Sequence, residues 1–249
     1  MGAVSLELDV GNSALKWRLM SESGRLQGGR VASSPAALGL LLDELSLENL
    51  TDIKVASVGS VERDEPLMHI LAASGVPVKL AVSQAFCRGV RNSYGDTSRM
   101  GVDRWLAMVA AFGVCGSACV VVDAGTALTI DIVDGGGMHQ GGYIIPGVAM
   151  SARALAEHTG RVRFDGADKQ SLAPGKDTES CVHHGKWLAQ YGAVQAAITL
   201  AEATQGSLEV FVTGGDAQGL MVVAGEYARH WQYCEELVLD GLAPVLASC

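Results

Sequence analysis

Two segments of the sequence place an aspartate, a glycine and a small polar residue directly after an apolar run. They are LELDVGNSALKWRLM (6–20) and VVVDAGTALTIDIVD (120–134). Their aspartates, Asp9 and Asp123, lie 123 − 9 = 114 residues apart, and so do the glycines that follow them. Each segment predicts a buried strand, a tight turn and a second strand of alternating polarity. The sequence therefore predicts a duplicated strand pair with an acidic residue before each turn.

The residue types in these turns suit phosphate and metal binding. A glycine on a tight turn lets the backbone approach a ligand closely. The neighbouring N–H groups and the side chains of Asn12, Ser13 or Thr126 can donate hydrogen bonds to phosphate oxygens. An aspartate at a strand end can hold Mg²⁺, usually through water, opposite those phosphates. Two such hairpins facing each other from related lobes would hold a nucleotide polyphosphate.

The alternative is a pair of ordinary hairpins whose Asp and Gly only form the turns. The second copy at the same separation favours the phosphate-binding interpretation. An aspartic protease also needs two carboxylates, but its motifs have Thr or Ser where this chain has Val10 and Ala124. The other common phosphate-binding loops, GxxxxGK[ST] and GxGxxG, do not occur.

Short apolar strands alternate with helical patterns along the chain, which predicts an α/β fold. Ser34-Pro35 favours a helix start, with Ser34 as the N-cap. The expected strands cover 4–20 (two strands), about 26–32, 53–58 and 78–82, then the 120–134 pair and 208–215. The expected helices cover 66–74, about 101–112 and 178 to about 204. A third strand-to-glycine turn, VFVTGGDA, contains Gly214 and Gly215.

Composition restricts the partners and the compartment. The formal charge of −9 and the pI near 5.1 argue against a nucleic-acid surface. The uncharged run 105–122 contains Gly113, Gly116 and Ser117, so we interpret it as a helix end and a separate strand, with no membrane span. The six cysteines form no CxxC pair, which is typical of reduced thiols in a cytoplasmic protein.

Six segments together resemble one known family, the type III pantothenate kinases, which include the Bvg accessory factor-like proteins. They are DVGNSALKW, YGDTSRMGVDRWLAMVAA, VVVDAGTALTIDIV, GGYIIPG, HTGRV and TGGDA, in this order over nearly the whole chain. The specific feature is GxDRW after a tyrosine-containing loop, followed by DxGTAxTxD. Each motif alone would be much weaker.

The resemblance implies the acetate and sugar kinase/Hsp70/actin fold. It has two ribonuclease-H-like lobes, expected at 1–115 and 116–249, with ATP between them. The implied reaction transfers the ATP γ-phosphoryl group to the 4′-hydroxyl of pantothenate, the first step of coenzyme A synthesis. The resemblance also implies Mg²⁺, a monovalent cation (potassium or ammonium), and a homodimer with pantothenate close to the dimer interface.

The resemblance assigns the nucleotide end of the site to both hairpins. The segment similar to the first phosphate loop is Asp9, Val10, Gly11, Asn12, Ser13, Ala14, Leu15 and Lys16. Asp9 would lie near Mg²⁺, although Ser13 stands where the family often has Thr. Asp123 matches the ligand of the monovalent cation, and Gly125 and Thr126 match the second phosphate loop. Gly214 and Gly215 look like the adenosine turn.

The substrate end is assigned to the GVDRW segment and its surroundings. The positions similar to substrate contacts are Tyr94, Gly101, Val102, Asp103, Arg104 and Thr178. Asp103 matches the proton acceptor for the substrate hydroxyl. Arg104 matches the residue that grips the pantothenate carboxylate, which suits its planar, bidentate guanidinium. A helix start and a neighbouring arginine both keep a carboxylate ionised, as a base requires.

Blander interpretations stay open for the same residues. Asp103 could simply favour a helix start and pair with a solvated Arg104, and Thr178 could be only an N-cap. We expect His183 and His184 to be partly exposed helix residues without a metal. The residues alone do not decide whether His158 and Arg161 face the site.

We expect Trp17 and Trp105 in the core or at a dimer contact.

A rival function is that of a regulatory protein that binds nucleotide on the same fold without catalysis. A pure binder has no need of a base, so the acidic residues, Asp103 above all, favour the enzyme.

Overall fold

The structure is a computed structural model that describes residues 3–45, 47–159, 164 and 169–247. The chain forms two compact units, which are described separately below. The first comprises Met1–Arg88, Tyr94–Ala110 and Leu237–Cys249, and the second comprises Gly89–Ser93 and Ala111–Glu236. The units differ from the lobes expected at 1–115 and 116–249, because the last helix belongs to the first unit and residues 89–93 and 111–115 belong to the second. The expected domain boundary itself stays a prediction.

The first unit is built on a five-stranded sheet in the order β3-β2-β1-β4-β5. Its strands are β1 (Val4–Val10), β2 (Ala14–Ser21), β3 (Gly24–Ala32), β4 (Leu50–Ser57) and β5 (Val78–Leu80), with the short β6 (Phe86–Cys87) outside the sheet. Its helices are α1 (Pro35–Glu44), η1 (Leu47–Asn49), α2 (Val61–Ala73), η2 (Thr97–Arg99), most of α3 (Val102–Cys115) and α7 (Leu237–Leu246). The first three strands form antiparallel pairs, and β4 and β5 run parallel to β1.

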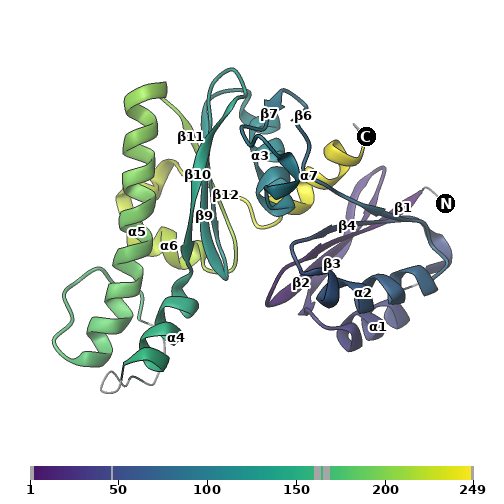
Figure 1. Cartoon of the computed structure of the whole chain (residues 1–249), viewed down its shortest axis with the longest axis horizontal. Coiled ribbons are helices and arrows are strands. Elements are labelled where there is room, and N and C mark those ends of the chain that lie inside the picture. Colours follow the sequence, from purple (N-terminus) through teal and green to yellow (C-terminus); the bar gives the residue numbers. More distant parts are fainter. Residues whose placement is uncertain (1–2, 46, 160–163, 165–168, 248–249) are drawn as a thin grey trace. The chain divides into compact units, whose positions relative to one another are not determined.

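The two faces of this sheet carry different chemistry. Helices α1 and α2 cover one face (Figure 1), and apolar side chains from β1, β2 and β4 pack there against Leu38 and Leu71. Helix α7 packs on β1 and β4. On the side of the sheet that α7 covers, the buried Glu7 carboxylate accepts hydrogen bonds from Arg18 at 2.8 Å and from Lys54 at 3.1 Å. Arg18 also donates to Asp240 of α7 at 2.6 Å. A charge cluster with a buried Glu7–Arg18 pair therefore joins the last helix to the sheet through the half-exposed Asp240.

The second unit repeats the same topology. Its sheet has the order β10-β9-β8-β11-β12. Its strands are β7 (Val90–Arg91), β8 (Cys119–Ala124), β9 (Ala127–Val133), β10 (His139–Pro146), β11 (Glu209–Thr213) and β12 (Gln232–Tyr233). Its helices are α4 (Val148–His158), α5 (Thr178–Gln205), α6 (Ala217–Ala224) and η3 (Gly225–His230). As in the first unit, three strands (β8, β9 and β10) form antiparallel pairs, and β11 and β12 run parallel to β8.

The predicted duplication is thus confirmed as two sheets of the same strand order and direction, the ribonuclease-H-like arrangement. Helices α5 and α6 pack against the second sheet through one apolar cluster that includes Trp187 and Leu220. Figure 1 shows α5 along that sheet. The motifs that follow β1 and β8 therefore occupy equivalent positions in the two units.

Several local expectations are confirmed. Ser34 caps α1, because its Oγ accepts a hydrogen bond from the Ala37 N–H at 3.3 Å. Trp17 and Trp105 are buried. The uncharged run 105–122 divides into α3 and β8 at Gly116, whose φ of +59° ends the helix. No helix in the described residues is long and apolar enough to span a bilayer.

Other expectations need correction. Helix α2 begins at Val61, five residues before the predicted start, so Pro66 lies inside it. The N-cap of α5 is Asp177, not Thr178. Its carboxylate accepts from the Ser180 N–H at 2.8 Å, and this hydrogen bond lowers the pKa of Asp177. The predicted start at Pro66 was too late because a proline usually stands in the first turn of a helix, whereas here it lies inside α2.

Candidate active site

The first turn joins β1 to β2 at the carboxyl end of β1. Asp9 lies opposite Lys16 in the strand register, and Val10 lies opposite Leu15, which leaves a four-residue turn at 11–14. The Gly11 N–H closes this turn by donating to the Ala14 carbonyl at 3.0 Å. The side chains of Asn12 and Ser13 are exposed. The predicted phosphate loop therefore presents its small polar side chains outwards.

Arg63 of α2, which belongs to none of the sequence motifs, holds this turn. Its Nη1 donates to Oδ1 of Asn12, and its Nη2 donates to the carbonyl of Gly11. Nη2 also donates to the Ser33 hydroxyl at 2.8 Å. One guanidinium thus connects the turn, the β3–α1 connection and α2. Because these contacts join residues 30 to 52 positions apart, no local sequence signal could have found them.

The GVDRW segment begins α3 in the same unit. The Asp103 carboxylate folds back over the start of the helix and accepts from the Arg104 N–H at 2.7 Å. A Cβ at Gly101 would lie only 2.6 Å from Asp103 Oδ1, so a larger residue there would displace this carboxylate. The aspartate is partly exposed. Its position in the first helical turn favours the charged carboxylate, as expected from the sequence.

Arg104 is buried, with 6% of its surface exposed. Its Nη1 donates to the hydroxyl of Tyr94 at 3.1 Å, and its guanidinium carbon lies 5.9 Å from the centre of the same ring. The open alternative of a solvated surface arginine is therefore wrong. A buried guanidinium has to keep hydrogen-bond partners, and the Tyr94 hydroxyl is one of them.

A cavity of about 570 Å³ lies at the carboxyl ends of β4 and β5 in the first unit. Its lining includes Ser57 of β4, which lies opposite Val10 at the end of β1, and Gly101 and Val102 at the start of α3. Ligands of parallel α/β sheets bind outside the carboxyl ends of the strands. The Asp9 turn and the GVDRW segment therefore lie at the same end of one sheet.

The second turn joins β8 to β9 and is one residue shorter. Ala124 lies opposite Leu128, which leaves a three-residue turn at 125–127. After the turns, equivalent residues of the two copies, such as Leu15 and Leu128, are therefore 128 − 15 = 113 positions apart. The Gly125 N–H closes the turn by donating to the Ala127 carbonyl at 3.0 Å. Thr126 is exposed at its tip.

Two glycine turns of the second unit support this hairpin. Gly214, with φ of +100°, lies against the backbone of Ala124 and the carboxylate of Asp123, and the Asp216 N–H donates to the Ala124 carbonyl at 2.8 Å. The predicted adenosine turn at 214–215 is thus adjacent to the second phosphate turn. On the other side, the Gly147 N–H donates to the Thr126 carbonyl at 3.1 Å.

Gly147 explains part of the GGYIIPG motif, to which the sequence analysis assigned no role. A side chain at Gly147 would overlap the carbonyl oxygens of Gly125 and Thr126. The residue is also the N-cap of α4, so the start of this helix lies against the turn. Helix N-termini favour anions, which suits the phosphate assignment of Thr126.

The remaining predicted residues lie on α4 and α5. Thr178 is the exposed first residue of α5. His183 is buried, contrary to the expectation, and its ring forms a T-shaped pair with the Phe164 ring. His158 is exposed at the end of α4, and Arg161 lies outside the described residues.

The described residues contain no group of three or more His, Cys, Asp or Glu side chains that could hold a metal alone.

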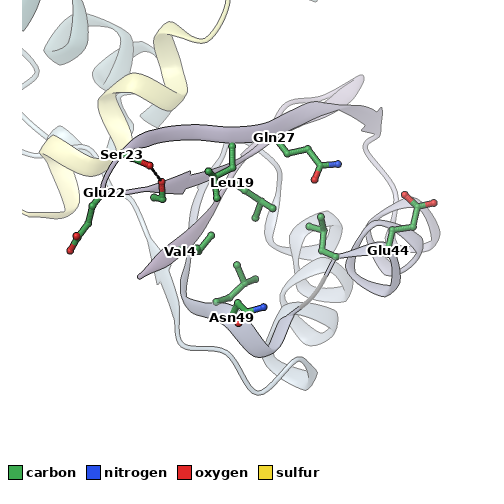
Figure 2. Close-up of a pocket in the computed structure, with 11 residues that line it drawn as sticks. Val4, Leu19, Glu22, Ser23, Gln27, Glu44 and Asn49 are labelled. Carbon is green, nitrogen blue, oxygen red and sulfur yellow. Dashed lines mark hydrogen bonds between the residues drawn. The ribbon is translucent and has the colours of Figure 1, made fainter. Parts of the chain in front are cut away.

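A second hollow, of about 600 Å³, lies at the other end of the first sheet (Figure 2). It is lined near the start of β1 by apolar side chains such as Val4, Leu19 and Leu50. In Figure 2 the side chains of Glu22 and Glu44 point outwards at its rim. None of the residues predicted for the site lines it.

The known proteins that this chain resembles have the same fold, and the similarity in sequence identifies its family. The family model described as type III pantothenate kinase matches residues 5–200, which is most of the chain. This chain belongs to the type III pantothenate kinase family. A type III pantothenate kinase of Marinobacter nauticus is 38% identical over 245 residues, 98% of each chain. Another, of Pseudomonas savastanoi pv. phaseolicola, is 40% identical over 220 residues, 85% of this chain and 88% of the relative.

Solved structures extend the likeness of this pantothenate kinase family member to the wider fold. A Baf family protein of Campylobacter jejuni has a TM-score of 0.61 at 22% identity, covering 98% of both chains. A ROK family glucokinase of Streptomyces griseus, crystallised with glucose and AMPPNP, has a TM-score of 0.54 at 13% identity, covering 99% of this chain and 100% of its own. At these identities the likeness shows the acetate and sugar kinase type of fold alone.

Proposed function

We propose that this protein transfers the γ-phosphoryl group of ATP to the 4′-hydroxyl of pantothenate. Membership of the type III pantothenate kinase family supports the substrate pair. The observation that carries the proposal is the start of α3. There, Asp103 stands beside a buried Arg104 that is fixed by Tyr94, at the same end of the sheet as the Asp9 turn.

Asp103 acts as the base in this proposal. Phosphoryl transfer depends mainly on positioning and charge neutralisation, and a carboxylate that accepts the hydroxyl proton assists the attacking oxygen. Arg104 binds the pantothenate carboxylate through its planar fork of donors. The Tyr94 hydroxyl orients the guanidinium, and Gly101, Val102 and Thr178 contribute contacts to the substrate.

The two turns bind the ATP phosphates from their respective units. The first uses the segment 9–16, and the second uses Gly125 and Thr126. Gly214 and Gly215 hold the adenosine. All these turns offer backbone N–H groups or small hydroxyl and amide side chains, which are the donors that phosphate oxygens require.

The donor set suits Mg²⁺ and a monovalent cation. A single carboxylate at the end of β1 suits Mg²⁺, which usually takes one or two carboxylates and completes its shell with water and phosphate oxygens. Asp9 would hold this ion, which neutralises phosphate charge when bound. Asp123, whose carboxylate lies beside the backbone of Gly125, would hold potassium or ammonium with oxygen ligands. A homodimer and a cytoplasmic location complete the proposal.

The test is a coupled assay with purified protein, ATP, Mg²⁺, potassium and pantothenate. We expect turnover from the wild type and none from Asp103→Asn, while Asp103→Asn still binds ATP in calorimetry. Asp43→Asn, an equal charge change at an exposed position of α1, should leave turnover unchanged. A folded wild type that binds ATP and yields no phosphopantothenate would contradict the proposal and favour the regulatory alternative.

A further inference from the structure

Arg63 is a cation at the first phosphate turn for which neither the motifs nor the family resemblance supplied a role. It is partly buried, it lies in the first turn of α2, and its guanidinium reaches three acceptors in two other segments. These are the carbonyl of Gly11, Oδ1 of Asn12 and Oγ of Ser33. A side chain that crosses between elements in this way fixes the turn relative to the helix.

The chemistry of the guanidinium determines which way the Asn12 side chain faces. Arginine has five N–H donors and no acceptor, and an asparagine amide has an oxygen on one side and an NH₂ group on the other. Only the oxygen can therefore face Arg63. The NH₂ group of Asn12 must then point away from Arg63, at an exposed position of the turn. Without Arg63 the amide can rotate by half a turn and present its oxygen instead.

The same contacts fix the backbone of Gly11. Its N–H donates to Ala14, and its carbonyl accepts from Arg63, so both backbone groups of Gly11 are bonded within the protein. A turn held in this way does not need to order itself when a ligand arrives. Pre-organisation of a loop increases affinity because the entropy of ordering has already been lost.

We propose that Arg63 is a positioning residue for ATP: it orients the Asn12 amide as a donor to the phosphates and adds positive charge at the turn. This inference rests on the proposed function, because it assumes that the first turn binds ATP phosphates. Its effect belongs to nucleotide binding and not to the pantothenate end of the site.

Steady-state kinetics and MgATP calorimetry on Arg63→Gln provide the test. We expect the KM and the Kd for ATP to rise about tenfold, which corresponds to one charged hydrogen-bonding group. The KM for pantothenate should stay within twofold of the wild type. Arg63→Lys retains the charge but cannot reach all the acceptors at once, so its effect should be intermediate. Ser33→Ala leaves both contacts with the turn and should change the ATP KM less than threefold.

A double variant tests whether Arg63 acts through Asn12. If it does, Asn12→Ala with Arg63→Gln should bind ATP no more than about twofold more weakly than the worse single variant. Arg25→Gln is the matched control, because it removes the same charge from an exposed site on β3, at the end of that strand away from the turn. It should leave both KM values unchanged.

The outcomes separate this inference from the proposed function. Turnover by the wild type together with an unchanged ATP KM in Arg63→Gln would overturn the inference and leave the function intact. Equal increases in both KM values, or fully additive effects in the double variant, would also overturn it, since they indicate general loosening of the unit. ATP binding without turnover would refute the function, and the ATP Kd of Arg63→Gln would still decide the inference. Failure of the wild type to bind ATP would overturn both.

Discussion

The two units have sheets of the same order and direction, yet they hold their equivalent turns by different means. The first turn has four residues, and a side chain from a helix, Arg63, bonds to it. The second turn has three residues and is supported by the backbone of two glycine segments, around Gly147 and Gly214. The repeated topology thus fixes where a phosphate turn can occur, and the neighbouring segments fix its shape.

The buried polar groups differ between the units in a similar way. On β2, Arg18 pairs with Glu7 of β1, and the equivalent position opposite Val121 in the second unit is Asp131 of β9. Asp131 bonds to His139 at 3.0 Å, and His139 bonds to the Ser93 hydroxyl at 2.8 Å. The first unit therefore buries a cluster of formal charges, and the second buries an Asp–His–Ser chain.

The largest expected effect comes from breaking the charge cluster of the first unit. Arg18→Ala would leave the Glu7 carboxylate with Lys54 alone and would remove the partner of Asp240. Removing one partner of a buried ion pair typically costs 3–5 kcal/mol, so we expect the free energy of unfolding to fall by about 4 kcal/mol. Denaturant unfolding measures this change.

The control for Arg18 is Arg25→Ala on the exposed edge strand β3, which should change stability by less than about 0.5 kcal/mol. Burial acts to lower the pKa of Arg18, but its hydrogen bonds to Asp240 and Glu7 outweigh burial and raise that pKa. Arg18 therefore stays charged at any working pH. If the free energy of unfolding falls no further in Arg18→Ala than in Arg25→Ala, the charge cluster does not stabilise the first unit as proposed.

The second prediction concerns the backbone support of the second turn. An alanine at Gly214 would need a φ of +100° and would overlap the Ala124 carbonyl. We expect Gly214→Ala to lower the free energy of unfolding by about 3 kcal/mol and to weaken ATP binding. Thermal unfolding and calorimetry measure the two effects.

Gly192→Ala is the matched control in the same unit, because a Cβ there meets open space on the exposed side of α5. It should raise the free energy of unfolding by about 0.5–1 kcal/mol, since alanine is the better helix former. Similar results for the two variants would show that the second turn does not depend on Gly214.

The third prediction compares the two turn glycines directly. A Cβ at Gly11 would lie 3.0 Å from the Ala14 carbonyl oxygen of the backbone, and a Cβ at Gly125 would lie at the longer distance of 3.3 Å from a side-chain atom, Oδ1 of Asp123. We expect Gly11→Ala to cost about 1 kcal/mol of stability and Gly125→Ala less than half of that. Unfolding midpoints of the two variants, measured without ligand, check the order. The reverse order would contradict the view that the first turn is the more tightly closed.

The smallest effect is a pH dependence that belongs to the first unit. Burial acts to raise the pKa of Asp52, but hydrogen bonds from Lys79 and Ser5 and the charge of Lys54 outweigh it and lower that pKa. A lowered folded-state pKa contributes stability above the unfolded value of about 3.9, and that stability is lost as the pH falls through the folded value. Between about pH 5 and 2.5, Asp52→Asn should therefore lose less stability than the wild type. Parallel pH curves for the two proteins would contradict this.

Much of the fold could be predicted because its signals are local. The apolar runs before Asp9 and Asp123 form β1 and β8, and Ser34-Pro35 starts α1 as expected. The start of α2 was missed because Pro66 stands inside the helix, where local propensity disfavours it and packing against the sheet outweighs that preference. His183 was expected to be partly exposed, but burial of a helix residue depends on what packs against it.

The sequence by itself determined the paired acidic turns, the GVDRW segment and the family, because each is a short run of residue types with a fixed spacing. Only the tertiary structure decided that Arg104 is buried against Tyr94, that Gly147 and Gly214 support the second turn, and that Arg63 holds the first. The physical reason is that these contacts join segments distant in the chain. Their geometry exists only once strands and helices have packed.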